Sequence, residues 1–135
     1  LGIVGLSQSI ALDMQRFGVR SNIVSPSAFT RMIETIPIKG PEGEARRKRQ
    51  EAMTPQKIAA PTVYLLSDLA SEVTGQIFYV RSNEIMLMSK NRPVRTVHRS
   101  DGWTPQKIHE HAMLAFKPHF LANDRSADYF VWDPV

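Results

Sequence analysis

The sequence contains no cysteine among its 135 residues. Disulfides, thiolate metal sites and cysteine nucleophiles are therefore excluded, and the composition suits a reducing compartment. The chain also lacks any apolar run near the roughly 20 residues needed to cross a bilayer, and it shows no signal-peptide pattern. These absences predict a soluble, cytoplasmic protein with no membrane contact, and they do not address a targeting signal on sequence that precedes Leu1.

Residues typical of metal sites are present but are not grouped. His109 and His111 are two positions apart, so on a helix they point about 200° away from each other and cannot hold the same ion. The other chemistry-bearing side chains show no Ser-His-Asp order and no paired carboxylates. The sequence thus predicts no metal site.

Excess positive charge is concentrated in one short run. The formal net charge is +4, and residues 46–49 read Arg-Arg-Lys-Arg. Such a run is typical of an exposed helix face. Contact with an anionic substrate tail or with nucleic acid is the alternative, and nucleic acid is the less favoured because no wider basic surface surrounds the run.

The first 26 residues have the pattern of a helix followed by a strand. Apolar residues recur at steps of three and four over Ile3–Phe17, which predicts an amphipathic helix, and Gly18 predicts its C-terminal cap. A β-rich run over 19–25 follows, and Pro26 should end it because proline cannot donate a ladder hydrogen bond. Together with a hydrophobic content of 42%, this predicts an α/β domain with a parallel sheet and one sizeable core.

The next segment is expected to be a mobile loop over 26–53 with an inserted helix over about 41–52. Thr54 and Pro55 then predict an N-cap and first turn for a helix ending near Ser67. Pro61 predicts a break or kink, with the helix proper starting near Ala60. Two β-rich stretches follow at 76–80 and 84–88, with the bend at 81–83.

The remaining residues are less regular. Thr104 and Pro105 predict another helix that closes before Pro118. The letters Thr-Pro-Gln-Lys-Ile occur at 54–58 and again at 104–108, and their different surroundings favour two uses of one helix start over a structural repeat. We expect residues 1–88 to form one domain and residues 89–135 a C-terminal extension that packs on it.

Three stretches of the sequence resemble the short-chain dehydrogenase/reductase family. They are Leu1-Gly2-Ile3-Val4-Gly5-Leu6-Ser7, Ile10-Ala11-Leu12-Asp13, and Gly18-Val19-Arg20-Ser21-Asn22-Ile23-Val24-Ser25-Pro26. In that family this helix begins with the catalytic Tyr-x-x-x-Lys. The resemblance therefore places both catalytic residues just upstream of Leu1 and leaves none of them in this chain.

A second set of letters resembles the last core helix and last strand of the same family. It comprises Ile58-Ala59, Tyr64-Leu65-Leu66-Ser67-Asp68, Ala70-Ser71 and Val73-Thr74-Gly75-Gln76, in the family's order and spacing. The two matches cover about Leu1–Val80. They imply the C-terminal part of a Rossmann-type, doubly wound parallel sheet, in which residues 33–53 form a substrate lid.

The loop after the first strand resembles the family's nicotinamide-side loop, and this resemblance assigns cofactor binding to Pro26, Ser27 and Thr30. Ser27 stands where the family has glycine, which would permit positive φ and close backbone approach. Thr30 comes one residue early. The ending Ala28-x-x-Arg31-Met32 is similar to the hydroxyacyl-CoA dehydrogenase units of multifunctional β-oxidation enzymes.

The resemblance implies part of an oxidoreductase that moves hydride between NAD or NADP and an alcohol or ketone, with 3-hydroxyacyl-CoA esters among the substrates. It also implies a homo-oligomer paired through the first helix, where Gly2 and Gly5 leave a shallow surface. Because the catalytic residues fall upstream of Leu1, we expect this chain alone to be inactive. The alternative is a non-catalytic binding or assembly module built on half of the fold.

Overall fold

The computed structural model describes all 135 residues and divides them into two compact units. Unit 1 comprises Leu1–Ser89 together with Trp132–Val135, and unit 2 comprises Lys90–Val131. The chain thus leaves unit 1 after Ser89 and returns to it for its last four residues. Each unit is described by itself.

Unit 1 opens with helix α1 (Gly2–Asp13), and a 3₁₀ turn (Gln15–Phe17) completes it. Gly18 then caps it in the left-handed region at φ 71°, a conformation that glycine adopts at little cost. The predicted helix and its glycine cap are confirmed. The last predicted turn is 3₁₀ because helix ends commonly tighten.

The apolar stripe of α1 does not face the interior of unit 1, contrary to what its periodicity suggests. Ile3 is 76% exposed and Leu6 63%, whereas Ser7 and Ala11 are buried. The Ser7 hydroxyl lies 2.8 Å from that of Ser21, so the helix approaches the strand region by its small, polar side. The stripe is left uncovered.

The expected sizeable core is also not found. The buried hydrophobic residues are few and mostly small, namely Ala11, Met53, Ala70, Val80 and, in unit 2, Ala112. A three-stranded sheet offers little area for burial, and the helix beside it contributes small side chains. Most of the apolar surface of the chain therefore remains exposed.

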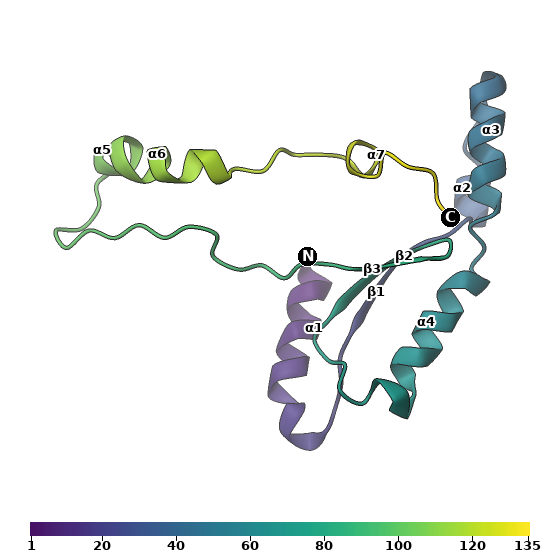
Figure 1. The fold of residues 1–135 in the computed structure, drawn as a ribbon, viewed down its shortest axis with the longest axis horizontal. Helices are drawn as coiled ribbons and strands as arrows, with labels where there is room; N and C mark the ends of the chain where they lie inside the picture. Colours follow the sequence, from purple (N-terminus) through teal and green to yellow (C-terminus); the bar gives the residue numbers. More distant parts are fainter. The chain divides into compact units, whose positions relative to one another are not determined.

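The sheet contains three strands in the order β1 (Ile23–Ser27), β2 (Ile77–Arg81) and β3 (Glu84–Leu87). β1 and β2 run parallel, and β2 and β3 form an antiparallel hairpin. Helices α1 and α4 (Gln56–Leu66) flank the strands on opposite sides (Figure 1). The α/β prediction is confirmed, with one antiparallel strand added to the parallel pair.

Strand β1 continues through Pro26, where the sequence predicted its end. Pro26 pairs with Val80, and Ser27 with Arg81. β1 lies at the edge of the three-stranded sheet, so it has a neighbour on one side. A proline is tolerated on an edge strand because its missing N–H can face the unpaired side. The predicted strand end was therefore wrong by two residues.

Two helices follow β1, α2 (Arg31–Glu34) and α3 (Gly40–Glu51), and the second matches the helix expected over 41–52. Helix α4 runs without interruption through Pro61, so the expected break is wrong. The helix loses one hydrogen bond there, which Lys57 would have accepted. The half-buried proline ring lines an apolar cavity together with Phe78, and its partial burial offsets part of the loss. A 3₁₀ turn (Asp68–Ala70) follows α4.

Unit 2 contains a helical segment that starts at the second copy of the repeated letters. It comprises α5 (Pro105–Lys107), a π-helical turn (Ile108–Ala112), α6 (Met113–Phe116) and a 3₁₀ turn (Lys117–His119), and α7 (Ser126–Tyr129) follows separately. The Thr104 hydroxyl accepts a hydrogen bond from the Lys107 amide at 3.3 Å, as a cap should. At the first copy the N-cap is Pro55, and no side chain caps the helix. The predicted start at Thr104 and Pro105 is confirmed, whereas the predicted cap at Thr54 is wrong by one residue.

The start of this segment is also held by charge. Arg99 and Lys107 both bond to Asp101, with shortest nitrogen–oxygen distances of 2.8 Å. The hydrogen bond from Arg99, followed by that from Lys107, lowers the pKa of Asp101 to about 2. Asp101 therefore stays ionised across the physiological range.

Candidate functional site

The parallel pairing of β1 and β2 places their carboxyl ends at the same edge of the sheet, with Ser27 opposite Arg81. We call this edge, with the loops that leave it, the carboxyl edge. Ligands of open α/β sheets bind outside the carboxyl ends of parallel strands. The carboxyl edge is therefore the candidate functional site.

The three residues assigned to cofactor binding lie on one continuous segment at this edge. Pro26 and Ser27 are the last residues of β1, and Thr30 precedes α2 as its N-cap. The Thr30 carbonyl accepts hydrogen bonds from the Ile33 and Glu34 amides at 2.9 and 3.0 Å. Its side chain is exposed and makes no capping bond. The hydroxyl is therefore available to a ligand.

Ser27 is accommodated without strain in this arrangement. It lies in a regular strand, and the sole non-glycine residue with positive φ is Ser82. The conformational freedom of glycine is thus not required at position 27. Contact of Ser27 with a cofactor stays a prediction.

The loop that carries Thr30 is anchored from two sides. The Phe29 amide donates a hydrogen bond to the carbonyl of Met53, a buried residue, at 2.7 Å. The Arg47 guanidinium lies 4.9 Å from the centre of the Phe29 ring, a cation–π distance. These contacts hold the loop against α3 and the residues that follow it.

The basic run 46–49 divides into residues with different environments. Arg47 donates hydrogen bonds to the carbonyls of Ile33 and Glu34 at 2.9 and 2.8 Å and pairs with Glu51 at 3.3 Å. Its side chain is largely buried, so the prediction that this arginine faces solvent or a substrate is wrong. The backbone carbonyls at the end of α2 account for the difference, because they have acceptor capacity that the helix does not use and are good acceptors for a guanidinium.

A second group of polar residues lies at the carboxyl end of β2. Arg81 pairs with Glu84 at 2.7 Å across the two-residue turn, and the Trp132 ring lies 5.2 Å from the Arg81 guanidinium. Trp132 also donates a hydrogen bond to Glu84, and the Asn83 amide donates one to the Val135 carbonyl at 2.7 Å. The last four residues of the chain are thus docked on the β2–β3 turn.

This contact changes the electrostatics of the turn. The hydrogen bond from Arg81 lowers the pKa of Glu84, burial opposes the shift, and the bond from Trp132 adds to it. Trp132 remains 46% exposed. The sequence analysis did not predict this cluster of Arg81, Glu84 and Trp132. The opposite charges of Arg81 and Glu84 on either side of a two-residue turn could have indicated their ion pair.

The opposite end of β1 is fixed by a network of polar side chains. Arg20 donates hydrogen bonds to the carbonyls of Leu65, Ala70 and Ser67 at 2.8, 2.7 and 3.2 Å. Asn22 donates to the Val73 carbonyl at 2.7 Å and accepts from the Gln76 amide at 3.0 Å. These residues position β1 against the segment that leads into β2, which is a structural role.

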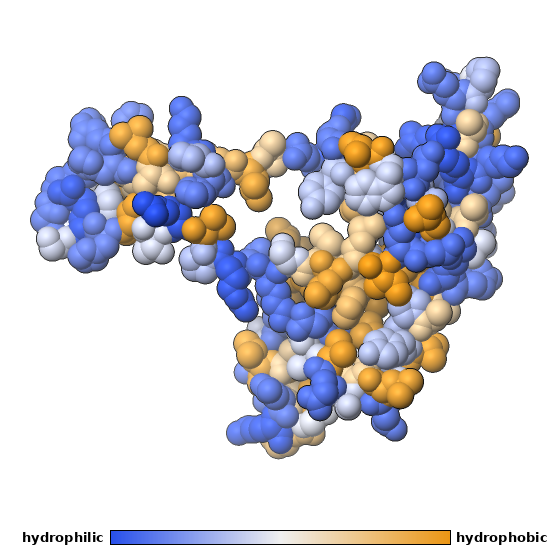
Figure 2. Space-filling model, in the orientation of Figure 1, coloured by the Kyte–Doolittle hydropathy of each residue, from blue (hydrophilic) through white to orange (hydrophobic).

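Unit 1 also carries an uncovered apolar surface, seen as orange patches in Figure 2. An apolar cavity of about 340 Å³ lies between α4 and the β2–β3 hairpin. It is lined by Ala60, Pro61, Tyr64, Leu65, Phe78 and Ile85. Neighbouring apolar side chains such as Leu66 and Leu87 are exposed.

Comparison with known proteins gives a consistent result. Residues 1–82 match the family described as "Enoyl-(Acyl carrier protein) reductase". The hydroxyacyl-CoA dehydrogenase ChsB1 of Mycobacterium tuberculosis is 31% identical over 134 residues, which cover 98% of this chain and 40% of that protein. The 3beta-hydroxysteroid dehydrogenase 1 of Eggerthella lenta is 32% identical over 83 residues, covering 58% of this chain and 32% of that protein.

A solved structure of a short chain dehydrogenase from Mycobacterium avium has a similar fold. It superposes with a TM-score of 0.65 and 25% identity, covering 86% of this chain and 34% of that one. The chain thus spans well under half the length of these relatives. Separately, none of the helices in the structure has both the length and the apolarity needed to span a membrane.

Proposed function

This chain belongs to the short-chain dehydrogenase/reductase family, and from that premise we propose that it forms the nicotinamide-side part of an NAD(P)-dependent oxidoreductase. The substrate class is an alcohol or ketone. One observation carries the proposal: a parallel strand pair ends at an edge where an exposed threonine hydroxyl has no partner within the chain.

The residues at the carboxyl edge suit the nicotinamide end of the cofactor. The carboxamide of nicotinamide has both a donor and an acceptor, and a threonine hydroxyl can bond with either. We assign this contact to Thr30, and the packing of the strand end against the ring to Pro26 and Ser27. When bound, NAD or NADP would accept or supply the hydride. The chain's own residues orient the carboxamide and hold the loop in place.

The acid and base of the reaction are assigned to residues outside this chain. Its tyrosines, Tyr64, Tyr79 and Tyr129, are followed four residues later by Asp68, Asn83 and Asp133, so no Tyr-x-x-x-Lys is present. We propose that this motif lies on sequence preceding Leu1. The chain by itself is then inactive.

The substrate lid is assigned to residues 33–53, which include α3. The relative ChsB1 is named a hydroxyacyl-CoA dehydrogenase, and its similarity extends over nearly the whole of this chain, including residues beyond the family match. This similarity, together with the sequence Ala28-x-x-Arg31-Met32, supports 3-hydroxyacyl-CoA esters as substrates.

Replacing Thr30 by valine tests the cofactor assignment. In the protein that joins this chain to its Tyr-x-x-x-Lys segment, Thr30→Val should weaken NAD(P) binding about two- to twelvefold, because a neutral hydrogen bond contributes about 0.5–1.5 kcal/mol. Fluorescence titration with NADH or NADPH measures the effect. Thr30→Ser keeps the hydroxyl and serves as the control. Unchanged affinity in Thr30→Val would refute the assignment.

We also propose that the full protein is a homo-oligomer in which α1 takes part. The exposed stripe that includes Ile3 and Leu6 supports this, and so do Gly2 and Gly5, where an added Cβ would meet nothing within 4 Å. Close helix packing against another subunit would use that space. Light scattering should give the mass of a dimer or larger, and Leu6→Glu should shift it to a monomer; a monomeric wild type would contradict the proposal.

A further inference from the structure

Segment 36–39 and helix α3 enclose a small cavity whose chemistry differs from that of the rest of the lid. Its volume is about 260 Å³, and it is lined by Ile36, Pro37, Ile38, Lys39, Gly43, Arg46, Arg47 and Gln50. Ligand pockets for whole small molecules usually have 300–1,000 Å³. This cavity therefore suits one group of a larger ligand.

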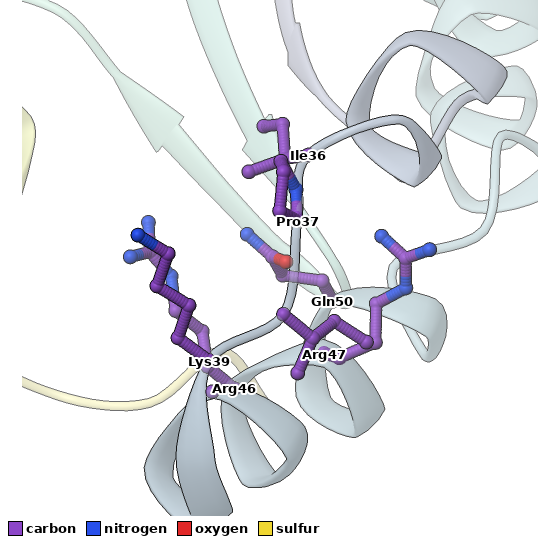
Figure 3. Close-up of a pocket in the computed structure, with 8 residues that line it drawn as sticks. Ile36, Pro37, Lys39, Arg46, Arg47 and Gln50 are labelled. Atoms are coloured by element: carbon purple, nitrogen blue, oxygen red, sulfur yellow. The ribbon is translucent and has the colours of Figure 1, made fainter.

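The walls combine positive charge with apolar surface. Figure 3 shows the charged ends of Lys39 and Arg46 directed to the same side of the cavity, whereas the Arg47 guanidinium points the other way. Ile36 and Ile38 supply the apolar part. Gly43 permits the close packing, because a Cβ there would lie 3.3 Å from the Ile38 side chain.

Lys39 and Arg46, the two cations on this side of the cavity, have no acidic partner. Arg47 is neutralised by Glu51, and Arg49 pairs with Asp133 outside the cavity at 3.1 Å. Lys39 and Arg46 form no ion pair, and no carboxylate lines the cavity. Glu42 precedes Arg46 by four residues on α3, a spacing that permits an ion pair, yet none forms. Two like charges facing one small space attract an anion.

From this arrangement we propose that the cavity binds a phosphate group carried on an apolar substrate. Arg46 donates hydrogen bonds to the phosphate oxygens, Lys39 adds a point charge, and the Gln50 amide is a neutral donor beside them. Ile36 and Ile38 contact the apolar part next to the phosphate. The assignment of this phosphate to the substrate rests on the proposed oxidoreductase function. The binding of a phosphate group in the cavity does not depend on that function.

Phosphate binding is measured on the 135-residue chain by isothermal titration with inorganic phosphate, hexyl phosphate and hexanol at low salt. Hexyl phosphate should bind more tightly than inorganic phosphate, and hexanol should not bind. The double substitution Lys39→Ala and Arg46→Ala should weaken hexyl phosphate binding about tenfold or more, since it removes both charge-assisted contacts. Lys48→Ala, an equally exposed cation on the same helix that does not line the cavity, should leave affinity within about twofold.

Further titrations test the apolar contact and the identity of the ligand. Ile36→Ala should reduce the preference for hexyl phosphate over inorganic phosphate without changing the latter's affinity. Equal losses in Lys48→Ala and in the double variant, or no saturable binding by the wild-type chain, would overturn the site. Displacement of hexyl phosphate by NADH would assign the cavity to the cofactor and overturn the substrate assignment. The titrations do not depend on turnover, so they test the phosphate site separately from the proposed function. If the chain binds phosphate but the full protein has no dehydrogenase activity, the proposed function is refuted and the phosphate site stands.

Discussion

Replacing Arg20 by methionine is expected to lower the free energy of unfolding of unit 1 by about 3 kcal/mol, because hydrogen bonds to a charged group contribute about 1.5–3 kcal/mol each and are not additive. The guanidinium bonds three carbonyls, two of them at the end of α4 and one at the turn that follows. Helix-end carbonyls carry partial negative charge and attract a cation. Methionine keeps much of the side-chain volume and removes the donors.

Urea denaturation followed by circular dichroism measures this loss. Arg20→Lys should recover part of it, because an ammonium group can reach some of the carbonyls but lacks the planar fork. Arg16→Ala is the matched control: Arg16 belongs to the neighbouring 3₁₀ turn and stacks on Phe17, and its removal should cost less than about 1 kcal/mol. Equal losses at positions 16 and 20 would refute the structural role of Arg20.

The second large effect concerns activity. The 135-residue chain alone is expected to show no dehydrogenase turnover and little binding of NADH or NADPH. A positioned acid or base contributes about 10²–10⁴-fold to rate, and the dinucleotide phosphates in this fold bind at a glycine-rich turn before a helix. Neither a Tyr-x-x-x-Lys nor such a turn occurs in the sequence.

The measurement compares the isolated chain with the protein that joins it to its Tyr-x-x-x-Lys segment. Both are assayed with alcohols, ketones and 3-hydroxyacyl-CoA esters, and both are titrated with the reduced cofactors. Turnover by the isolated chain close to that of the longer protein would contradict the placement of the catalytic residues before Leu1.

Local signals predicted the elements well. Gly18 ended its helix as expected, because the left-handed cap depends on a single residue type. Thr104 caps its helix as predicted, whereas near Thr54 the helix begins one residue later, with Pro55 as its N-cap. The two prolines were misjudged for a common reason. Pro26 is tolerated because β1 lies at an edge of the sheet, and Pro61 because its half-buried ring lies on the apolar side of α4, next to the cavity that Phe78 also lines. The position of a strand in its sheet and the packing around a side chain depend on the tertiary structure, so a short stretch of sequence does not predict them.

The candidate site was predicted in part. The resemblance placed Pro26, Ser27 and Thr30 at the end of the first strand and in the loop after it, and the parallel pairing of β1 and β2 puts this segment at the carboxyl edge. Their contact with a cofactor stays a prediction. The charge run misled for Arg47, since its partners are backbone carbonyls 13 and 14 residues away. The contact of Trp132 with Glu84 joins residues 48 apart and depends on the chain returning to unit 1. No local pattern encodes that return.

The docking of Trp132–Val135 also has an entropic consequence. Residues 90–131 connect two parts of unit 1, and closing a flexible loop of that length costs at least about 3 kcal/mol. The Trp132 and Val135 contacts return roughly 3–5 kcal/mol by the usual values for a backbone bond, a charged hydrogen bond and a cation–π pair. The free energy gained by docking the tail is therefore close to the free-energy cost of closing the loop. The fraction of molecules with Trp132–Val135 docked thus depends on the length of the loop as well as on the contacts of these residues. Halving the loop should make docking more favourable by about 0.6 kcal/mol.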